Sequence, residues 1–396
     1  MKTTTRIPEG FLFSTTEAAI KKPGRKDLAL IYSAEEAVMS GMFTTSSVKA
    51  APVKLDMKRI RSGRGQAIIV NSGNANACTG SQGMKDADEM TALAAEMLSI
   101  SKTRVYVCST GVIGSPMPMD RVRASIVDLI DGLARNTVDD AAAAIMTTDT
   151  FPKVVSKKIT VEGKGITITG FCKGAGMIQP NMATMLCFIL TDANIAKPAL
   201  DAALKAAVKR SFNRITIDGD MSTNDTVLVM ANGMAANSVL KKSSDDFERF
   251  AKALDRVCYD LCRMIVKDGE GATKFVEIEV KNARSEAEAE KAAMSIANSL
   301  LVKTALYGND ANWGRLMAVL GYSKVALKEE KVDIFLNGLK VASKGSATGK
   351  DKEANEKLKS NEIKILIDLH IGKGSAKVLT CDLTEDYVKI NAEYRT

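Results

Sequence analysis

The sequence predicts a mixed α/β fold. Short runs of apolar and β-branched residues, which favour strands, alternate along the chain with segments whose apolar residues recur at helical spacing. A continuous apolar run at 185–190 is typical of a buried strand, and a glycine-containing turn at 163–165 joins two strand-like segments, 159–161 and 166–171. The 396 residues exceed the size at which one hydrophobic core keeps growing, so we expect two domains.

Each element follows from its local pattern. We expect further strands at 67–70, 105–108, 227–230 and 275–280, and helices at 84–98, 121–133, 199–209, 247–265 and 287–306. Ser285 and Glu288 form a capping-box pattern ahead of the last helix. From about residue 281 the chain continues with that long helix, a polar stretch and alternating strands. We therefore expect a catalytic core at 1–280 and a smaller C-terminal α/β domain at 281–396.

Composition excludes several classes of protein. The first residues lack the pattern of a secretory signal, and nowhere does an apolar run approach the length that spans a bilayer, so we expect a cytoplasmic protein without a membrane partner. Seven cysteines without a CxxC pair indicate reduced thiols. The net charge of +8 comes from basic residues interleaved with acidic ones, with few aromatics, which argues against nucleic acid and suits small anionic substrates.

The chain contains a single histidine, His370. Most of the chain therefore lacks the usual general base and the usual metal ligand, and we expect no metal site. His370 follows the apolar-polar alternation that begins at Glu362, which predicts a strand residue rather than a catalyst. Any chemistry here has to proceed without imidazole.

The segment 172–186, CKGAGMIQPNMATML, is bent by glycines and a proline and places Thr184 immediately before the apolar run. A threonine in this place often only begins a strand. It becomes a nucleophile if cleavage before it frees an α-amine, because that amine, with a pKa of about 7.7–8.0, can act as the base. The branched Cβ of threonine also restricts χ1 and so helps to hold the hydroxyl in one geometry.

With these residues in view, the chain resembles the ornithine acetyltransferases, also called bifunctional glutamate N-acetyltransferases, of arginine biosynthesis. The resemblance runs from end to end through an ordered series of motifs. These are GRKDLALI (24–31), IVNSGNANACTG (69–80), STGVIG (109–114), KGAGMIQPNMATML (173–186), NRITIDGDMSTNDTV (213–227), DGEGATKF (268–275), NWGR (312–315) and the terminal NAEYRT. The chain departs from the usual family pattern at Ser46 and at 309–311.

The resemblance implies an N-terminal-nucleophile-like, layered α/β/β/α core and a precursor that cleaves itself between Ala183 and Thr184. The products would be an α chain, 1–183, and a β chain, 184–396. Thr184 would take acetyl from N-acetylornithine and pass it to glutamate, with Thr110 and Gly111 stabilising the oxyanion. The implied substrate contacts are Thr147, Lys173, Thr184, Glu270, Asn391 and Thr396.

These side chains suit their implied tasks. Lys173 can bind the α-carboxylate that both substrates carry, while Glu270 can face the ornithine ammonium or orient the α-amine of the nucleophile. Taken alone, Lys173 and Glu270 would be surface charges and Asn391 part of a frayed tail, so the resemblance predicts that the C-terminus returns to the site. We expect the Asn/Gly loop at 71–80 to have a structural role, whereas Trp313 either lies near the site or packs in a core.

The same resemblance implies no dissociable cofactor for acetyl exchange and an assembly of two αβ pairs. The motifs are shared by enzymes that do and do not use acetyl-CoA as a second donor. Two rival classes are a hydrolase of the N-terminal-nucleophile type, such as an aminopeptidase or amidohydrolase, and a non-catalytic anion-binding protein. The first would prefer water to glutamate as the acceptor, and the second leaves the segment 173–186 unexplained.

Overall fold

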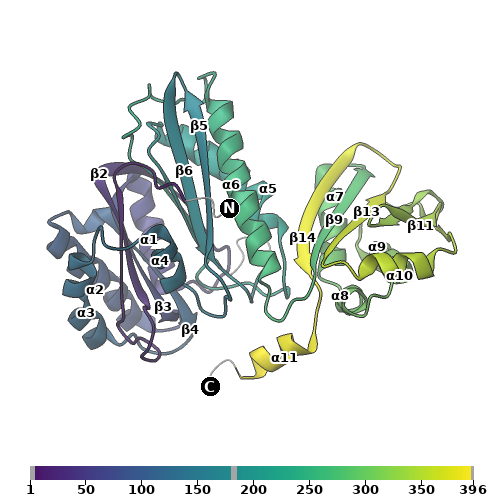
Figure 1. The fold of residues 1–396 in the computed structure, drawn as a ribbon, viewed down its shortest axis with the longest axis horizontal. Coiled ribbons are helices and arrows are strands. Elements are labelled where there is room, and N and C mark those ends of the chain that lie inside the picture. The colour runs from purple at the N-terminus through teal and green to yellow at the C-terminus, as the bar shows by residue number, and fades with distance from the viewer. Residues whose placement is uncertain (1–4, 180–184, 394–396) are drawn as a thin grey trace. The chain divides into compact units, whose positions relative to one another are not determined.

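The computed structural model describes residues 5–179 and 185–393. The described chain forms two compact units. Unit 1 comprises residues 5–174, 185–213 and 221–261, and unit 2 comprises residues 175–179, 214–220 and 262–393. Each unit contains one sheet with helices, which confirms the mixed α/β class (Figure 1).

Unit 1 is built on an eight-stranded sheet in the order β4-β3-β2-β8-β7-β6-β5, with β1 paired to β2. Strands β3 and β4 are parallel, as are β7 and β8, and the remaining neighbours are antiparallel. The strands are β1 (Phe11–Thr16), β2 (Leu28–Phe43), β3 (Arg64–Asn74), β4 (Val105–Val112), β5 (Lys153–Val161), β6 (Lys164–Lys173), β7 (Leu186–Thr191) and β8 (Thr226–Ala231).

The long strand β2 turns this sheet into two facing halves. Its first part pairs with β1 and β3 and its last part with β8, and the register shifts between Tyr32 and Ala37. Phe13 of β1 and Phe171 of β6 are not on paired strands, yet their rings meet edge to face at 6.2 Å. One buried apolar cluster contains residues from both halves. The halves therefore pack against each other as the two β layers.

Helices cover the outer face of each half. Helices α2 (Gly80–Leu98) and α3 (Met119–Asp131) share a buried cluster with β2, β3 and β4. On the other half, a Cβ at Gly170 of β6 would lie 2.9 Å from Val257 of α6 (Phe247–Lys267), so the helix packs directly on that strand. Helix α5 (Lys197–Arg210) lies against β2, where Ser40 donates a hydrogen bond to Asp201 at 2.6 Å. The layered α/β/β/α core is confirmed. Unit 1 also contains α1 (Ala51–Arg59) and α4 (Val138–Ala144).

Unit 2 is a smaller α/β unit with a six-stranded sheet in the order β12-β11-β10-β13-β9-β14. Its apolar core lies between this sheet and helices α7, α8, α9 and α10. The strands are β9 (Phe275–Ala283), β10 (Asp333–Leu336), β11 (Leu339–Ser343), β12 (Ser346–Ala347), β13 (Glu362–Asp368) and β14 (Gly374–Cys381). The helices are α7 (Glu286–Ala297), α8 (Leu300–Tyr307), α9 (Trp313–Tyr322), α10 (Asp351–Leu358) and α11 (Glu385–Ala392).

Two expectations from the sequence are wrong. The helix expected at 287–306 is two helices, because α7 ends at Ala297 and the hydroxyl of Ser299 accepts a hydrogen bond from the N–H of Val302 and caps α8. His370 lies beyond the end of β13, in the left-handed region with φ 49°. Its half-exposed ring lies 3.4 Å from a carboxylate oxygen of Asp333.

The boundary between the compact units also differs from the division expected at 280/281. Strand β9 crosses that position and pairs with β13 and β14, so it belongs with the C-terminal sheet. Two short segments that precede and follow the 185–213 stretch, 175–179 and 214–220, also belong to unit 2.

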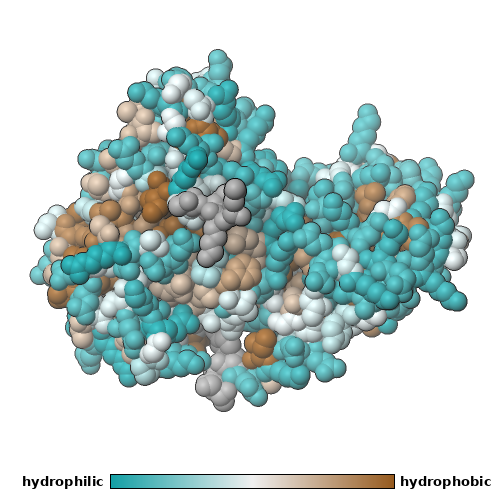
Figure 2. All heavy atoms as spheres, in the orientation of Figure 1, coloured by the Kyte–Doolittle hydropathy of each residue, from teal (hydrophilic) through white to brown (hydrophobic). Residues whose placement is uncertain are grey.

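The molecular surface is largely hydrophilic on the face shown in Figure 2. Across the described ranges, no helix combines the length and the hydrophobicity that crossing a bilayer requires. Cys258 and Cys262 are buried in α6, in agreement with the packing role expected from their spacing.

Candidate active site

The C-terminal end of β4 carries Thr110 and Gly111. Thr110 is 5% exposed, and Gly111 has φ 136°, a conformation that favours glycine. A Cβ at Gly111 would lie 2.3 Å from the carbonyl carbon of Gly73 and 2.5 Å from the nitrogen of Asn74. The end of β3 thus requires glycine at 111. The structural role expected for the Asn/Gly loop at 71–80 stays a prediction.

Asparagine side chains hold this strand end in place. The amide of Asn224 donates to the carbonyl oxygens of Ala75 and Ser109, both at 2.7 Å, and the amide of Asn74 donates to the carbonyl of Ser115 at 3.1 Å. Asn224 therefore ties the loop after β3 to the residue before Thr110. The sequence motif 213–227 contains Asn224, but nothing in the motif indicates which distant carbonyls it binds.

Thr147 and Lys173, two of the expected substrate contacts, are organised around a buried carboxylate that the sequence did not indicate, Asp149. Its oxygens accept hydrogen bonds from the N–H of Thr147 at 3.0 Å, the ammonium of Lys153 at 2.7 Å and the N–H of Gly174 at 2.7 Å. The side chains of Asp149 and Lys153 are fully buried, and Lys173 is 4% exposed. The structure thus brings Thr147 and the end of β6 together in unit 1.

The electrostatics of this cluster favour an ionised Asp149. Burial raises the pKa of the carboxyl, but the positive charges of Lys173 and Lys153, with the hydrogen bonds from Lys153 and Gly174, outweigh burial and lower the pKa to about 2. Asp149 is therefore a carboxylate at neutral pH. The positive charge of Lys173 suits the binding of an anionic substrate group.

Glu270 and Asn391, two further expected contacts, meet in unit 2. The amide of Asn391, on α11, donates to Oε2 of Glu270 at 2.9 Å. Glu270 is 9% exposed, and its N–H donates to the carbonyl of Ala175 at 2.9 Å. A Cβ at Gly176 would lie 2.3 Å from the Glu270 carboxyl carbon, so Gly176 is in direct contact with this side chain. The C-terminal helix thus returns to the segment that leads toward Thr184.

Three of the expected site residues, Ala183, Thr184 and Thr396, lie outside the described residues. Trp313 begins α9 and packs against the apolar core of unit 2.

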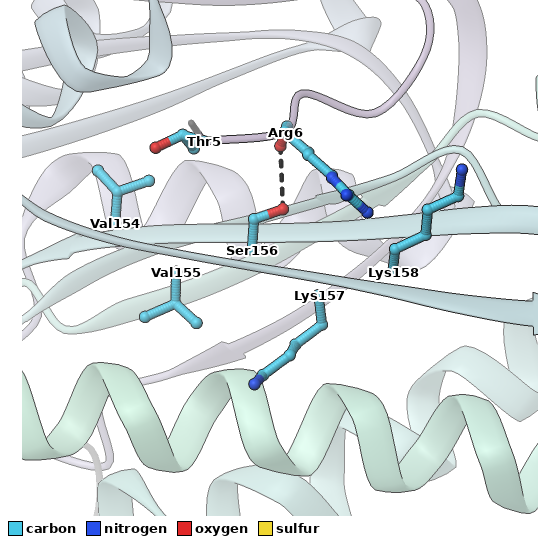
Figure 3. A pocket seen from close by; sticks show the side chains of 7 residues that line it. All are labelled: Thr5, Arg6, Val154, Val155, Ser156, Lys157 and Lys158. Carbon is cyan, nitrogen blue, oxygen red and sulfur yellow. Dashed lines mark hydrogen bonds between the residues drawn. The ribbon is translucent and has the colours of Figure 1, made fainter. Parts of the chain in front are cut away.

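A pocket elsewhere in unit 1 contains none of the expected site residues. It lies along β5 and is lined by Thr5, Arg6 and residues 154–158 (Figure 3). The hydroxyl of Ser156 donates to the carbonyl of Arg6 at 3.1 Å, and successive side chains of β5 point to opposite sides. This pocket has neither a buried nucleophile nor an oxyanion donor, and we assign it no role in the chemistry.

Comparison with known proteins identifies the family. The model of the ArgJ family matches residues 12–396. The chain belongs to the ArgJ family. It is similar to the arginine biosynthesis bifunctional protein ArgJ of Geobacter sulfurreducens, with 54% identity over 390 residues that cover 98% of this chain and 99% of the relative. The corresponding protein of Caldanaerobacter subterraneus is 53% identical over 395 residues, covering 98% of each chain.

A solved structure also resembles this ArgJ-family chain. The crystal structure of the arginine biosynthesis bifunctional protein ArgJ from Bacillus halodurans matches with a TM-score of 0.51 and 47% identity. The match covers 97% of that crystallised chain but 52% of this one. The crystallised polypeptide is therefore about half as long as the present chain.

Proposed function

We propose that this chain is a self-cleaving acetyltransferase that moves acetyl from N-acetyl-L-ornithine to L-glutamate through an acetyl ester on Thr184. The observation that carries this proposal is the match of residues 12–396 to the ArgJ family, with 54% identity to a relative named as an arginine biosynthesis bifunctional protein. The site geometry supports it, because Thr110, Lys173 and Glu270 are buried and Asn391 donates a hydrogen bond to Glu270.

The first reaction creates the nucleophile. The Thr184 oxygen attacks the carbonyl carbon of Ala183, a C–O bond forms, the Ala183–Thr184 C–N bond breaks, and the hydroxyl proton ends on the nitrogen. Water then hydrolyses the ester, which leaves a carboxylate on Ala183 and restores the Thr184 hydroxyl beside a free α-amine. The half-length crystallised chain of the Bacillus halodurans relative is consistent with such a cut.

The second reaction is the acetyl exchange. The α-amine of Thr184 takes the hydroxyl proton while the oxygen attacks the acetyl carbonyl of N-acetylornithine, and it returns the proton to the departing ornithine amine. The amine of glutamate then attacks the ester, so that N-acetylglutamate leaves and the hydroxyl is restored. Each transfer passes through an oxyanion, for which the Thr110 hydroxyl and the Gly111 N–H are the proposed donors.

The proposed substrate contacts fall into two groups, one that binds a carboxylate and one that binds an ammonium group. Thr147 and Lys173, both ordered by Asp149, bind the α-carboxylate that the two substrates share. Glu270 accepts a hydrogen bond from Asn391 on one carboxylate oxygen. Its carboxylate binds an ammonium group, either that of ornithine or the α-amine of Thr184. Thr396 completes the proposed set.

Two further features belong to this proposal. Acetyl-CoA is proposed as a second acetyl donor, on the ground that the relatives are named bifunctional. Formation of N-acetylglutamate from acetyl-CoA without N-acetylornithine tests it. We also propose an assembly of two αβ pairs, which the mass of the purified protein in solution would reveal.

Trapping the acyl-enzyme tests the central step. The enzyme is incubated with N-acetylornithine in the absence of glutamate, and the masses of its polypeptides are measured. We expect the β chain alone to gain one acetyl group, located on Thr184, and to lose it on addition of glutamate. T184A is expected to stay uncut and unacetylated. Faster loss of the acetyl group to water than to glutamate would instead favour the hydrolase.

A further inference from the structure

Helix α11 is held within unit 2 by polar contacts and not by an apolar face. None of its eight residues, all of which the structure describes, is buried, and the side chain of Val388 is 63% exposed. Burial of apolar side chains is what usually fixes a surface helix against its neighbours. The position of α11, and with it that of Asn391, therefore depends on a few hydrogen bonds.

The residues that make these contacts share one face of α11. Thr384 is the N-cap residue of the helix, and Tyr387 and Asn391 follow it by three and seven positions. At 3.6 residues per turn, these spacings place the three side chains on one side of the helix. The hydroxyl of Tyr387 lies 3.3 Å from a carboxylate oxygen of Asp218. Asn391, about two turns from Thr384, donates to Glu270.

The hydroxyl of Thr384 has two partners. It donates a hydrogen bond to the carbonyl of Gly271 at 2.7 Å and accepts one from the N–H of Tyr387 at 3.4 Å. The first bond attaches it to the residue that follows Glu270, and the second caps the first turn of α11. Thr384 is 6% exposed, so both bonds are shielded from water. One oxygen atom thus connects the loop that carries Glu270 to the start of the helix that carries Asn391.

Gly271 allows the helix to approach this closely. Its φ of 67° lies in the left-handed region, and a Cβ at this position would lie 2.6 Å from the backbone nitrogen of Tyr387. The first turn of α11 therefore contacts the backbone of the loop directly, and the Thr384 hydroxyl fixes this contact.

The loop is itself fixed from its other end. The buried carboxylate of Asp382 accepts hydrogen bonds from the N–H groups of Thr273 at 2.9 Å and Lys274 at 3.0 Å. Asp382 lies in the connection between β14 and α11, two residues before Thr384. The connection and the loop thus hold each other at two points, and Thr384 is the point nearer to Glu270.

We propose that Thr384 is a positioning residue for the pair of Glu270 and Asn391: its hydroxyl sets the start of α11 on the loop so that the Asn391 amide meets the Glu270 carboxylate. The inference rests on the proposed function, because it assumes that these two residues bind substrate. Asn391 lies about 10 Å along the helix axis from Thr384, so a tilt of about 6° moves it by about 1 Å. A displacement of that size can cost roughly a hundredfold in rate.

Unit 2 also provides a matched control. The hydroxyl of Ser285 accepts a hydrogen bond from the N–H of Glu288 at 3.2 Å and caps α7, as Thr384 caps α11. Within the described part of the chain, the Ser285 hydroxyl makes no hydrogen bond to the loop that carries Glu270. S285A therefore reports the loss of a helix cap alone.

The experiment compares kcat/KM for acetyl exchange from N-acetylornithine, expressed per cleaved chain, in the wild type, T384A, T384S, S285A, N391A and T384A/N391A. We expect T384A to lose about tenfold, S285A to stay within about twofold of the wild type, and T384S to recover most of the loss. If Thr384 acts through Asn391, T384A/N391A should equal N391A within about twofold, whereas independent effects would multiply. Thermal unfolding of T384A and S285A measures the loss of a cap separately, and the two midpoints should fall by similar amounts.

Several results would overturn the inference. T384A could have the kinetics of S285A, or T384S could be as slow as T384A. The losses of T384A and N391A could multiply in the double variant, which would show that Thr384 acts elsewhere. N391A could match the wild type, which would remove the residue through which Thr384 is proposed to act. If the wild type itself exchanged no acetyl, the proposed function would fail first, and the wild-type measurement alone would show it.

Discussion

Asn391 of helix α11 donates a hydrogen bond to the carboxylate of Glu270 at 2.9 Å. The two residues are 121 positions apart in the sequence, and the bond connects the last helix of the chain to the loop that follows α6. Glu270 in turn packs against Gly176, in the segment that leads toward Thr184. Helix α11 is therefore part of the proposed site.

Replacement of Asn391 tests this connection. N391A removes the donor to Glu270, and because a hydrogen bond to a charged group contributes about 1.5–3 kcal/mol, kcat/KM for N-acetylornithine should fall about tenfold or more. K389A is the matched control, since Lys389 lies on the same helix and pairs with the exposed Asp386. Equal kinetics of N391A and K389A would remove Asn391 from the site.

Replacement of Thr110 tests the oxyanion assignment. T110A should lower kcat by about 10²–10³-fold, the usual cost of losing one such donor, while the thermal unfolding temperature changes little. T110S retains the hydroxyl and should keep most of the activity. Steady-state kinetics of the cleaved variants provide the comparison. A T110A enzyme with the kcat of T110S would show that the hydroxyl does not contact the oxyanion.

The buried pair of Asp149 and Lys153 predicts a large effect on stability. D149N leaves the fully buried Lys153 without its ionic partner and should lower the free energy of unfolding by about 3–5 kcal/mol. The double variant D149L/K153M removes both charges and should recover much of that loss. It should still bind substrate poorly, because the N–H groups of Thr147 and Gly174 lose their acceptor. Urea unfolding and KM values measure the two effects separately.

The same carboxyl predicts a pH dependence. The pKa of Asp149 is lowered from 3.8 to about 2 in the folded chain, so the ionised form is favoured by folding. Its contribution to stability is present above the unfolded value of 3.8 and disappears as the pH falls toward about 2. The difference in unfolding free energy between wild type and D149N should therefore shrink across that interval. A difference that stays constant down to the folded pKa would contradict the assignment.

Local sequence patterns predicted most of the helices and strands correctly. The apolar run at 185–190 corresponds to β7, the segment 247–265 to α6, and the turn at 163–165 to the β5–β6 hairpin. The break between α7 and α8 was missed because the apolar spacing continues through Asn298 and Ser299, although Ser299 is a favourable N-cap. The place of strand β9 in the C-terminal sheet was not predicted, because its partners, β13 and β14, lie far along the chain.

The candidate site also contains residues that the sequence predicted and a residue that it did not. Thr110, Lys173 and Glu270 were predicted as site residues through motifs that resemble a known family. Asp149 was not predicted, because one of its partners is the N–H of Gly174, in another segment, and no spacing in the sequence records such a contact. A buried aspartate that serves a distant loop looks, in the sequence, like any aspartate in a turn.

The most direct test of the whole account is N-terminal sequencing of the purified, active protein, together with the intact masses of its polypeptides. We predict two chains, the second beginning Thr-Met-Leu-Cys with a free α-amine on Thr184, and one full-length, inactive chain for T184A. A single uncut polypeptide with full acetyl-exchange activity would contradict the central claim, because the threonine hydroxyl would then have no α-amine beside it to act as its base.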